Sequence, residues 1–190
     1  FPDRSYPENY LGLVGMISTI ENQVNNKRFP STHTTPDAIT INQLLSDMVD
    51  TGCEYCFMEV SSHAISQKRI SGLDFDIAVF TNISRDHLDY HGTFENYLNT
   101  KKSFFDQLSP KAKAIVNIDD PDGCEIARDS QAQNIPYGQR LASLYYGTII
   151  RSSVDGLCIG FDGLWEDKGG LEEITMNTDL VGDFNLYNLL

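Results

Sequence analysis

The sequence TNISRDHLDYHG, residues 81–92, follows the apolar run IAVF at residues 77–80. The apolar run predicts a short buried strand, and the polar residues after it predict a loop at its carboxyl end. In open α/β sheets, ligands bind beyond the carboxyl ends of the strands. The loop carries carboxylate, imidazole, guanidinium and amide groups within a few residues. Because several of these groups can bind metal ions, the stretch favours a ligand site over a solvated turn.

A helix is predicted directly after this loop, because apolar residues recur at helical spacing. Lys101 falls in the middle of the apolar stripe, whereas Lys102 lies to its side. Burial opposes the charge of a lysine and lowers its pKa, and a neutral amine is a nucleophile, including towards carbon dioxide. The alternative is a lysine whose stem covers apolar surface while its ammonium group stays in water. The apolar positions are Phe94, Tyr97, Leu98, Phe104, Phe105 and Leu108.

The composition restricts the classes of function. The chain has 190 residues, enough for one α/β domain with an appendage. Its formal net charge of -13 argues against a nucleic acid or an anionic membrane as a partner, but not against a small anion held locally by amides and cations. No apolar run approaches the length of a membrane span, and no signal-peptide pattern is visible. The four cysteines fit a reducing compartment, so a cytoplasmic location is expected.

Further signals predict helices and strands along the chain. Thr35 suits a helix N-cap and Pro36 suits the first helical position, while Gly52 suits the position just after the helix. A helix N-terminus also attracts anions, so Thr34 and Thr35 are either capping residues or anion ligands. Residues 21–33 are expected to form a polar connection.

The order of strands and helices predicts the fold class. Apolar segments at 11–20, 55–58, 77–80 and 114–117 predict strands separated by helices, with the strand at 55–58 in a central position. This alternation is typical of α/β proteins with a doubly wound, mostly parallel sheet. Over residues 135–181 it gives way to strands joined by Gly- and Asp-containing turns, which predicts a small β-rich subdomain appended to a single domain.

Two further sets of residues lie at the ends of predicted elements. Glu59 closes the strand at 55–58, where a carboxylate is a candidate metal ligand or simply a charge at a strand end. Asn185 and Asn188 are three residues apart and share a face of the last predicted helix. Taken alone, these two asparagines are caps or surface amides.

The motifs occur together in an order that closely resembles the central, ATP-binding domain of the Mur ligases. The resemblance runs from about Gly12 to Leu190 and is greatest with the members that add the third peptide residue to the peptidoglycan precursor. The combination of EVSSH, a Gln-x-Arg pair and NxxxDHLDYH is highly specific, whereas each motif alone is weak. The matching segments are Thr34-Thr35-Pro36, Glu59-Val60-Ser61-Ser62-His63, Gln67 with Arg69, Asn82 to His91, Lys101, Asn117-Ile118-Asp119-Asp120 and Gly182-Asp183-Phe184-Asn185.

The resemblance implies an ATP-dependent amide-bond ligase. Such enzymes phosphorylate a carboxylate of UDP-N-acetylmuramoyl-L-Ala-D-Glu with ATP, and the amino group of diaminopimelate or lysine then attacks the acyl phosphate. Magnesium ions that bridge the phosphates would offset the negative charge gathered in this reaction.

The resemblance also implies roles for single residues. Glu59 and His87 would bind Mg²⁺, and Lys101 would be carbamylated and bind the second Mg²⁺; these three are the expected catalytic residues. Arg69 would pair with an anionic group of the substrate. The positions that match the family's site for the UDP-muramoyl peptide are Thr34, Thr35, Ser61, Gln67 and Arg69, and those that match its nucleotide site are Asn82, Asn185 and Asn188.

The chain departs from the family pattern at its start. The family's glycine-rich phosphate loop, which ends in Gly-Lys-Thr-Thr, and the strand before it should precede Gly12, and this chain does not contain them. The family's amino-terminal uridine-binding domain and its carboxy-terminal domain are also expected to be missing. We therefore expect the chain alone to have no ligase activity and to bind ATP weakly.

Three other hypotheses are kept. The first is another amide ligase of the same superfamily, such as a folylpolyglutamate or cyanophycin synthetase. The second is a metallohydrolase in which Asp86, His87, Asp89 and His91 form a metal cluster, with no need for Lys101. The third is a non-catalytic remnant that binds a partner or a sugar nucleotide.

Overall fold

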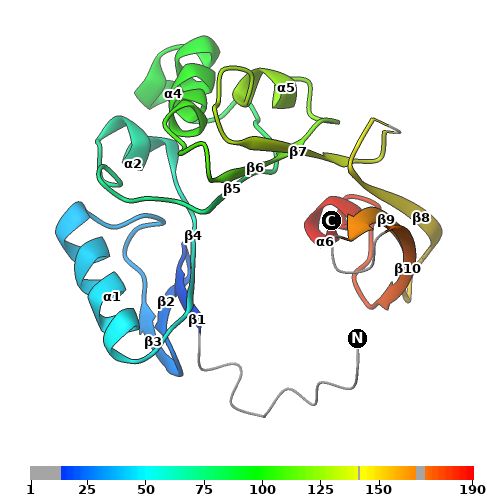
Figure 1. Cartoon of the computed structure of the whole chain (residues 1–190), viewed down its shortest axis with the longest axis horizontal. Helices are drawn as coiled ribbons and strands as arrows, with labels where there is room; N and C mark the ends of the chain where they lie inside the picture. Colours follow the sequence, from blue (N-terminus) through cyan, green and yellow to red (C-terminus); the bar gives the residue numbers. More distant parts are fainter. Residues whose placement is uncertain (1–13, 141, 166–169) are drawn as a thin grey trace. The chain divides into compact units, whose positions relative to one another are not determined.

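The computed structural model describes residues 14–140, 142–165 and 170–190. The first three residues of the strand expected at 11–20 lie outside these described residues. The chain divides into two compact units, Phe1–Leu73 and Asp74–Leu190. Figure 1 labels most of the helices and strands of the two units.

The first unit is a four-stranded sheet with a helix packed on one face. Strands β1, β2 and β3 form an antiparallel meander, and β4 pairs with β1 in parallel, which gives the order β3-β2-β1-β4. Helix α1 buries Ile41 and Met48 against Ile17 and Val24 of the sheet. The elements are β1 (Val14–Ile17), β2 (Glu21–Val24), β3 (Lys27–Pro30), α1 (Ala38–Asp50), β4 (Tyr55–Met58) and α2 (Ser62–Ser66).

The start of α1 differs from the prediction. The N-cap is Asp37 rather than Thr35, because the Asp37 carboxylate accepts hydrogen bonds from the N–H groups of Ile39 and Thr40. The hydroxyl of Thr35 is buried and bonded elsewhere. The predicted helix end is confirmed, since Gly52 follows α1 with φ of 82°, a conformation that glycine adopts without steric penalty.

Two further predictions for this unit were wrong. The expected polar connection contains the hairpin β2–β3, whose turn is formed by Asn25, at φ of 53°, and Asn26. Strand β4 is not central among the described residues, because it pairs there only with β1. Its side chains Tyr55 and Phe57 are accordingly 60% and 64% exposed.

The second unit is built on a six-stranded mixed sheet of order β10-β9-β8-β7-β6-β5. Strands β5 to β8 pair in parallel, and β8 to β10 pair antiparallel. The β-rich region thus continues the parallel sheet through the β7–β8 pair. The elements are β5 (Ile77–Phe80), α3 (Leu88–His91), α4 (Phe94–Asp106), β6 (Lys113–Asn117), α5 (Gly123–Ile126), β7 (Gln133–Gly138), β8 (Tyr145–Ser153), β9 (Gly156–Trp165), β10 (Gly170–Thr178) and α6 (Asn185–Leu189).

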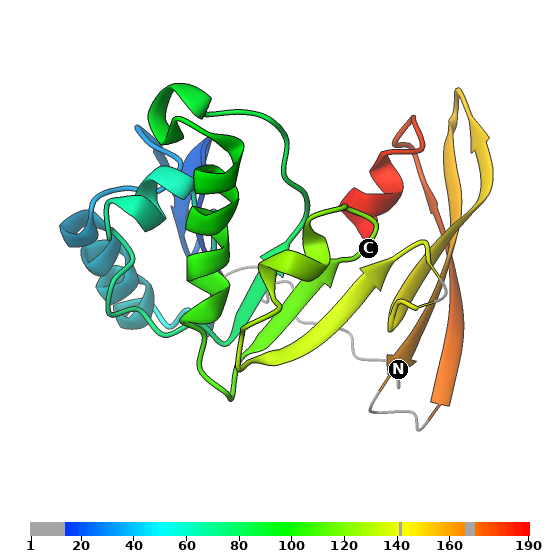
Figure 2. The same cartoon turned by 90° about the horizontal axis from the view of Figure 1, so that it is seen from above.

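Helices α4 and α5 cover one face of β5, β6 and β7 (Figures 1 and 2). The core between them follows from strand alternation: Ala78 and Phe80 of β5 point inward, whereas Ile77 and Val79 are more than half exposed. Helix α6 packs Leu186 against β9 in a second cluster. The α/β fold class expected from the sequence is confirmed, and β5 and β6 lie where the apolar runs predicted them.

Candidate functional site

In the first unit, the predicted residues meet at the carboxyl ends of β1 and β4. The parallel register pairs Ile17 with Met58, so the residues that follow the two strands lie side by side. The Glu59 N–H donates to the Ile17 carbonyl at 2.9 Å. The Glu59 Oε2 atom accepts hydrogen bonds from Thr19 N at 2.9 Å and from Thr19 Oγ1 at 2.5 Å. The Thr19 hydroxyl also lies 3.0 Å from that of Thr34. Thr19 was not among the predicted site residues.

A second network in this unit centres on Thr35, which is 1% exposed. Its hydroxyl donates to the Glu59 carbonyl at 2.7 Å and accepts from the Ser61 N–H at 3.0 Å. Arg69 Nη1 donates to the Thr35 carbonyl at 2.7 Å, and the Arg69 Nε and Nη2 atoms both donate to Gln67 Oε1. These acceptors are neutral oxygens and do not offset the charge of Arg69, which therefore suits an anionic ligand.

In the second unit, two predicted residues gather around Tyr97. The Lys101 Nζ atom lies 5.5 Å from the centre of the Tyr97 ring, one helical turn along α4. The His87 ring approaches the same ring edge-on at 5.9 Å. Burial lowers the pKa of Lys101, which enlarges the fraction of neutral amine.

His87 has an unusual backbone conformation. Its φ is 55°, in the left-handed region that residues other than glycine rarely adopt and that often marks functional sites. Its N–H donates to Asp86 Oδ1 at 2.7 Å. The imidazole is 46% exposed and thus accessible to a ligand. The neighbouring His91, which was assigned no role, is buried and stacks on Tyr97 at 5.1 Å.

The metal cluster of the metallohydrolase hypothesis does not form. Within the described part of the chain, no three His, Cys, Asp or Glu side chains are placed to hold a metal ion. His91 is buried against Tyr97, whereas Asp86 and Asp89 are exposed. The Mg²⁺ ligands expected from the family resemblance are a different set, with Glu59 in the first unit and His87 and Lys101 in the second.

The loop after β5 is fixed from the neighbouring strand β6. The Asn117 side-chain amide donates to the Thr81 carbonyl at 2.8 Å, and the Ile83 N–H donates to Asp120 Oδ2 at 3.1 Å. Between these two contacts, Asn82 is exposed. The Asn-x-Asp-Asp motif thus holds the backbone on both sides of a predicted nucleotide-binding residue.

The two asparagines of α6 contact each other, as their spacing predicted. Asn188 Nδ2 donates to Asn185 Oδ1 at 2.9 Å, and Asn185 Nδ2 donates to the Val181 carbonyl at 2.9 Å. Asn185 is buried, whereas Asn188 is exposed. Between them, the Tyr187 hydroxyl donates to Asp119 Oδ2 at 3.0 Å, which ties α6 to the end of β6.

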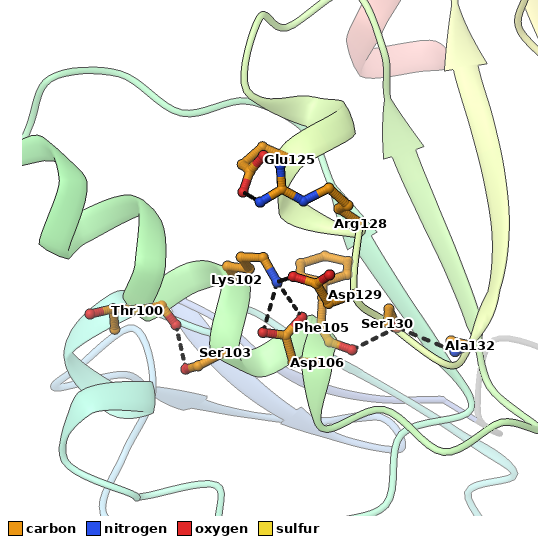
Figure 3. A network of polar contacts seen from close by, with 10 residues as sticks. All are labelled: Thr100, Lys102, Ser103, Phe105, Asp106, Glu125, Arg128, Asp129, Ser130 and Ala132. Atoms are coloured by element: carbon orange, nitrogen blue, oxygen red, sulfur yellow. Dashed lines mark hydrogen bonds and ion pairs between the residues drawn. The ribbon is translucent and has the colours of Figure 1, made fainter.

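The two lysines of α4 occupy opposite environments. Lys102 is the more buried by surface area, contrary to the prediction from the helical stripe, and Lys101 is half-buried. Lys102 Nζ lies 2.7 Å from Asp106 Oδ1 and 2.6 Å from Asp129 Oδ2 (Figure 3). Burial alone would lower the pKa of Lys102, but hydrogen bonds and charge from the two carboxylates outweigh burial and raise it. Lys102 is thus held as a cation, whereas burial lowers the pKa of Lys101 with no carboxylate to oppose it.

Comparisons with known proteins place this geometry in a family. A family model described as Mur ligase middle domain matches residues 7–190. The chain is 44% identical over 182 residues to the UDP-N-acetylmuramoyl-L-alanyl-D-glutamate--2,6-diaminopimelate ligase of Bacteroides thetaiotaomicron, an alignment that covers 95% of the chain. It covers 36% of that curated relative, so the chain spans little more than a third of the relative's length.

Solved structures show the same fold. A structure of a UDP-N-acetylmuramoyl-L-alanyl-D-glutamate--2,6-diaminopimelate ligase matches with a TM-score of 0.78 and 28% identity, over 93% of this chain and 35% of the other. Escherichia coli FolC in complex with DHPP and ADP matches with a TM-score of 0.55 and 17% identity, over 93% of this chain and 45% of the other. The second likeness shows a shared fold alone. No helix in the described ranges is long and apolar enough to cross a membrane.

Proposed function

Because the chain belongs to the Mur ligase family and matches its middle domain, we propose that it forms the ATP-binding part of a ligase that extends UDP-N-acetylmuramoyl-L-Ala-D-Glu. The third amino acid is diaminopimelate or lysine, and the names of the curated relatives favour diaminopimelate. The γ-phosphoryl group of ATP passes to a substrate carboxylate and ADP leaves. The amino group of the third residue then attacks the acyl carbon, loses a proton and displaces phosphate.

The observation that carries this proposal is the environment of Lys101. Its position over the Tyr97 ring, which the His87 ring also contacts, and its lowered pKa suit an amine that reacts with carbon dioxide. In that reaction an N–C bond forms, a proton is released and the side chain becomes an anionic carbamate. Lys102 cannot replace it, because two carboxylates hold Lys102 as a cation.

Glu59 and a carbamate on Lys101 would offer the oxygen ligands that Mg²⁺ prefers, whereas His87 would offer a nitrogen. The Glu59 carboxylate is exposed, and only its Oε2 atom carries the two hydrogen bonds from Thr19. The His87 ring is half-exposed, and a carbamate on Lys101 would add two further oxygens. When bound, the ions would neutralise the charge of the phosphates and the acyl phosphate.

The remaining site residues bind and orient the substrates. Arg69 supplies a positive charge whose position is fixed by Thr35 and Gln67, and we assign it to an anionic group of the UDP-muramoyl peptide. Asn185 and Asn188 form one hydrogen-bonded pair, which we assign to the adenine side of ATP together with Asn82.

The test uses the complete ligase that contains this chain. Repeated turnover of ATP to ADP and phosphate should require both UDP-N-acetylmuramoyl-L-Ala-D-Glu and the third amino acid, and Lys101→Ala should abolish it almost completely, with partial rescue by small carboxylate anions. The matched control is Lys102→Met on the same helix, which should keep most of the activity. Full activity of Lys101→Ala would disprove the carbamate. ADP release that instead requires a folate and glutamate would identify a different ligase of the superfamily.

A further inference from the structure

Thr19 joins two residues that the proposed function places in separate roles. It lies just after β1, and the parallel pairing of β1 with β4 brings it beside Glu59, which is 40 residues away in the sequence. The Thr19 N–H and hydroxyl both donate to the Glu59 Oε2 atom. The same hydroxyl contacts the hydroxyl of Thr34 at 3.0 Å.

The direction of these hydrogen bonds follows from the number of protons. The Thr19 hydroxyl has a single proton, and the anionic carboxylate accepts it at 2.5 Å. The shared proton in the contact with Thr34 therefore comes from Thr34. The result is a chain that runs from the Thr34 hydroxyl through Thr19 to the Glu59 carboxylate.

These hydrogen bonds fix the side chain of Glu59, which would otherwise be mobile. Glu59 is exposed, and an exposed glutamate samples several rotamers, which must be given up when it binds a metal ion. Because both Thr19 donors hold Oε2, the Oε1 atom is presented in one orientation. Hydrogen bonds of this kind to a metal-binding carboxylate typically change metal affinity by 10–100-fold when they are removed.

We propose that Thr19 is a positioning residue of the metal site. It orients the Glu59 carboxylate for Mg²⁺ and couples that carboxylate to Thr34 on the side that binds the UDP-muramoyl peptide. The inference rests on the proposed function, which makes Glu59 a metal ligand and Thr34 a substrate contact.

The test measures metal binding directly in the complete ligase, with Mn²⁺ as a paramagnetic probe titrated by electron paramagnetic resonance. Thr19→Val should weaken Mn²⁺ binding by about 10–100-fold, whereas Thr19→Ser, which keeps the hydroxyl, should stay close to the wild type. In the wild type, UDP-N-acetylmuramoyl-L-Ala-D-Glu should tighten Mn²⁺ binding, and Thr19→Val should lose this coupling. The matched control is Thr175→Val, at an exposed position of β10, which should change neither quantity.

The outcomes separate this inference from the proposed function. Wild-type Mn²⁺ affinity in a folded Thr19→Val protein, together with weak binding in Glu59→Gln, would overturn the role of Thr19 alone. Wild-type affinity in both variants would show that Glu59 is not a metal ligand. If Thr19→Val does not fold, Thr19→Ala removes the same hydroxyl without adding a methyl group, and the same readings apply.

Discussion

Replacing Lys102 with methionine is expected to destabilise the second unit, whereas the same replacement of Lys101, its neighbour on α4, is not. The Lys102 side chain is 10% exposed and contacts Asp106, which is 36% exposed, and Asp129, which is 63% exposed (Figure 3). Because both carboxylates can regain water once the lysine is gone, the loss should resemble that of surface ion pairs. We expect about 1 kcal/mol rather than the larger loss known for fully buried pairs.

Lys101→Met changes two opposing interactions. The charged amine attracts the Tyr97 ring, a contact of about 0.5 kcal/mol at partly exposed sites. Burial opposes the same charge and lowers the pKa of Lys101, so the two interactions offset each other. The variant should therefore be as stable as the wild type or slightly more stable.

The pH dependence of stability provides a second test of the predicted difference between Lys101→Met and the wild type. The pKa of Lys101 is lower in the folded than in the unfolded chain, where it lies near 10.5. Between these two values the unfolded chain binds more protons, so the wild type gains stability as the pH rises. Any advantage of Lys101→Met should be largest below the folded pKa and vanish near the unfolded pKa.

Thermal unfolding followed by circular dichroism compares both variants with the wild type. The expected loss in Lys102→Met corresponds to a melting temperature lower by about 2–4 °C for a chain of this size. A loss of stability in Lys101→Met as large as that in Lys102→Met would refute the contrast between the two lysines.

Three further predictions concern the two units. Thr35→Val removes the acceptor of the Ser61 N–H, so urea denaturation should show a free energy of unfolding of the first unit lower by about 2 kcal/mol. Thr35→Ser keeps the hydroxyl and should avoid this loss, so equal stability of the two variants would contradict the network. Gly123→Ala would place a Cβ 2.0 Å from the Asn117 carbonyl oxygen, so the melting temperature should fall, and an unchanged value would mean that α5 lies farther from β6. Burial raises the pKa of Tyr137 to about 12, so stability should fall as the pH rises from about 10 to 12; the same alkaline loss in Tyr137→Phe would exclude this tyrosine as its cause.

Sequence patterns correctly predicted the structural features that depend only on residues nearby in the sequence. The apolar run at β5 alternates in burial as a strand does, and Gly52 ends α1 because its backbone conformation favours glycine. Asn185 and Asn188 contact each other because three residues separate them on a helix. In each case the reason lies within a few residues of the position itself.

The remaining features depend on partners far away in the chain. Thr35 looks like an N-cap in sequence, but its hydroxyl bonds to residues near Glu59, so Asp37 takes the cap. The burial of Lys102 depends on Asp129, which lies on a loop 27 residues later. The helical periodicity of α4 cannot reveal this contact, because Asp129 is not part of the helix. Thr19 meets Glu59 only through the parallel register of β1 and β4. A sequence pattern could have found Thr19 only after that pairing was known.

The proposed ligase chemistry is tested most directly by following the oxygen atoms of the substrate carboxylate. The complete ligase would receive ATP, diaminopimelate and UDP-N-acetylmuramoyl-L-Ala-D-Glu whose reacting carboxylate carries isotopically heavy oxygen. Because an acyl phosphate passes one carboxylate oxygen to the departing phosphate, mass spectrometry should find one heavy oxygen in each phosphate released. Phosphate without heavy oxygen, formed while the amide product accumulates, would contradict the account.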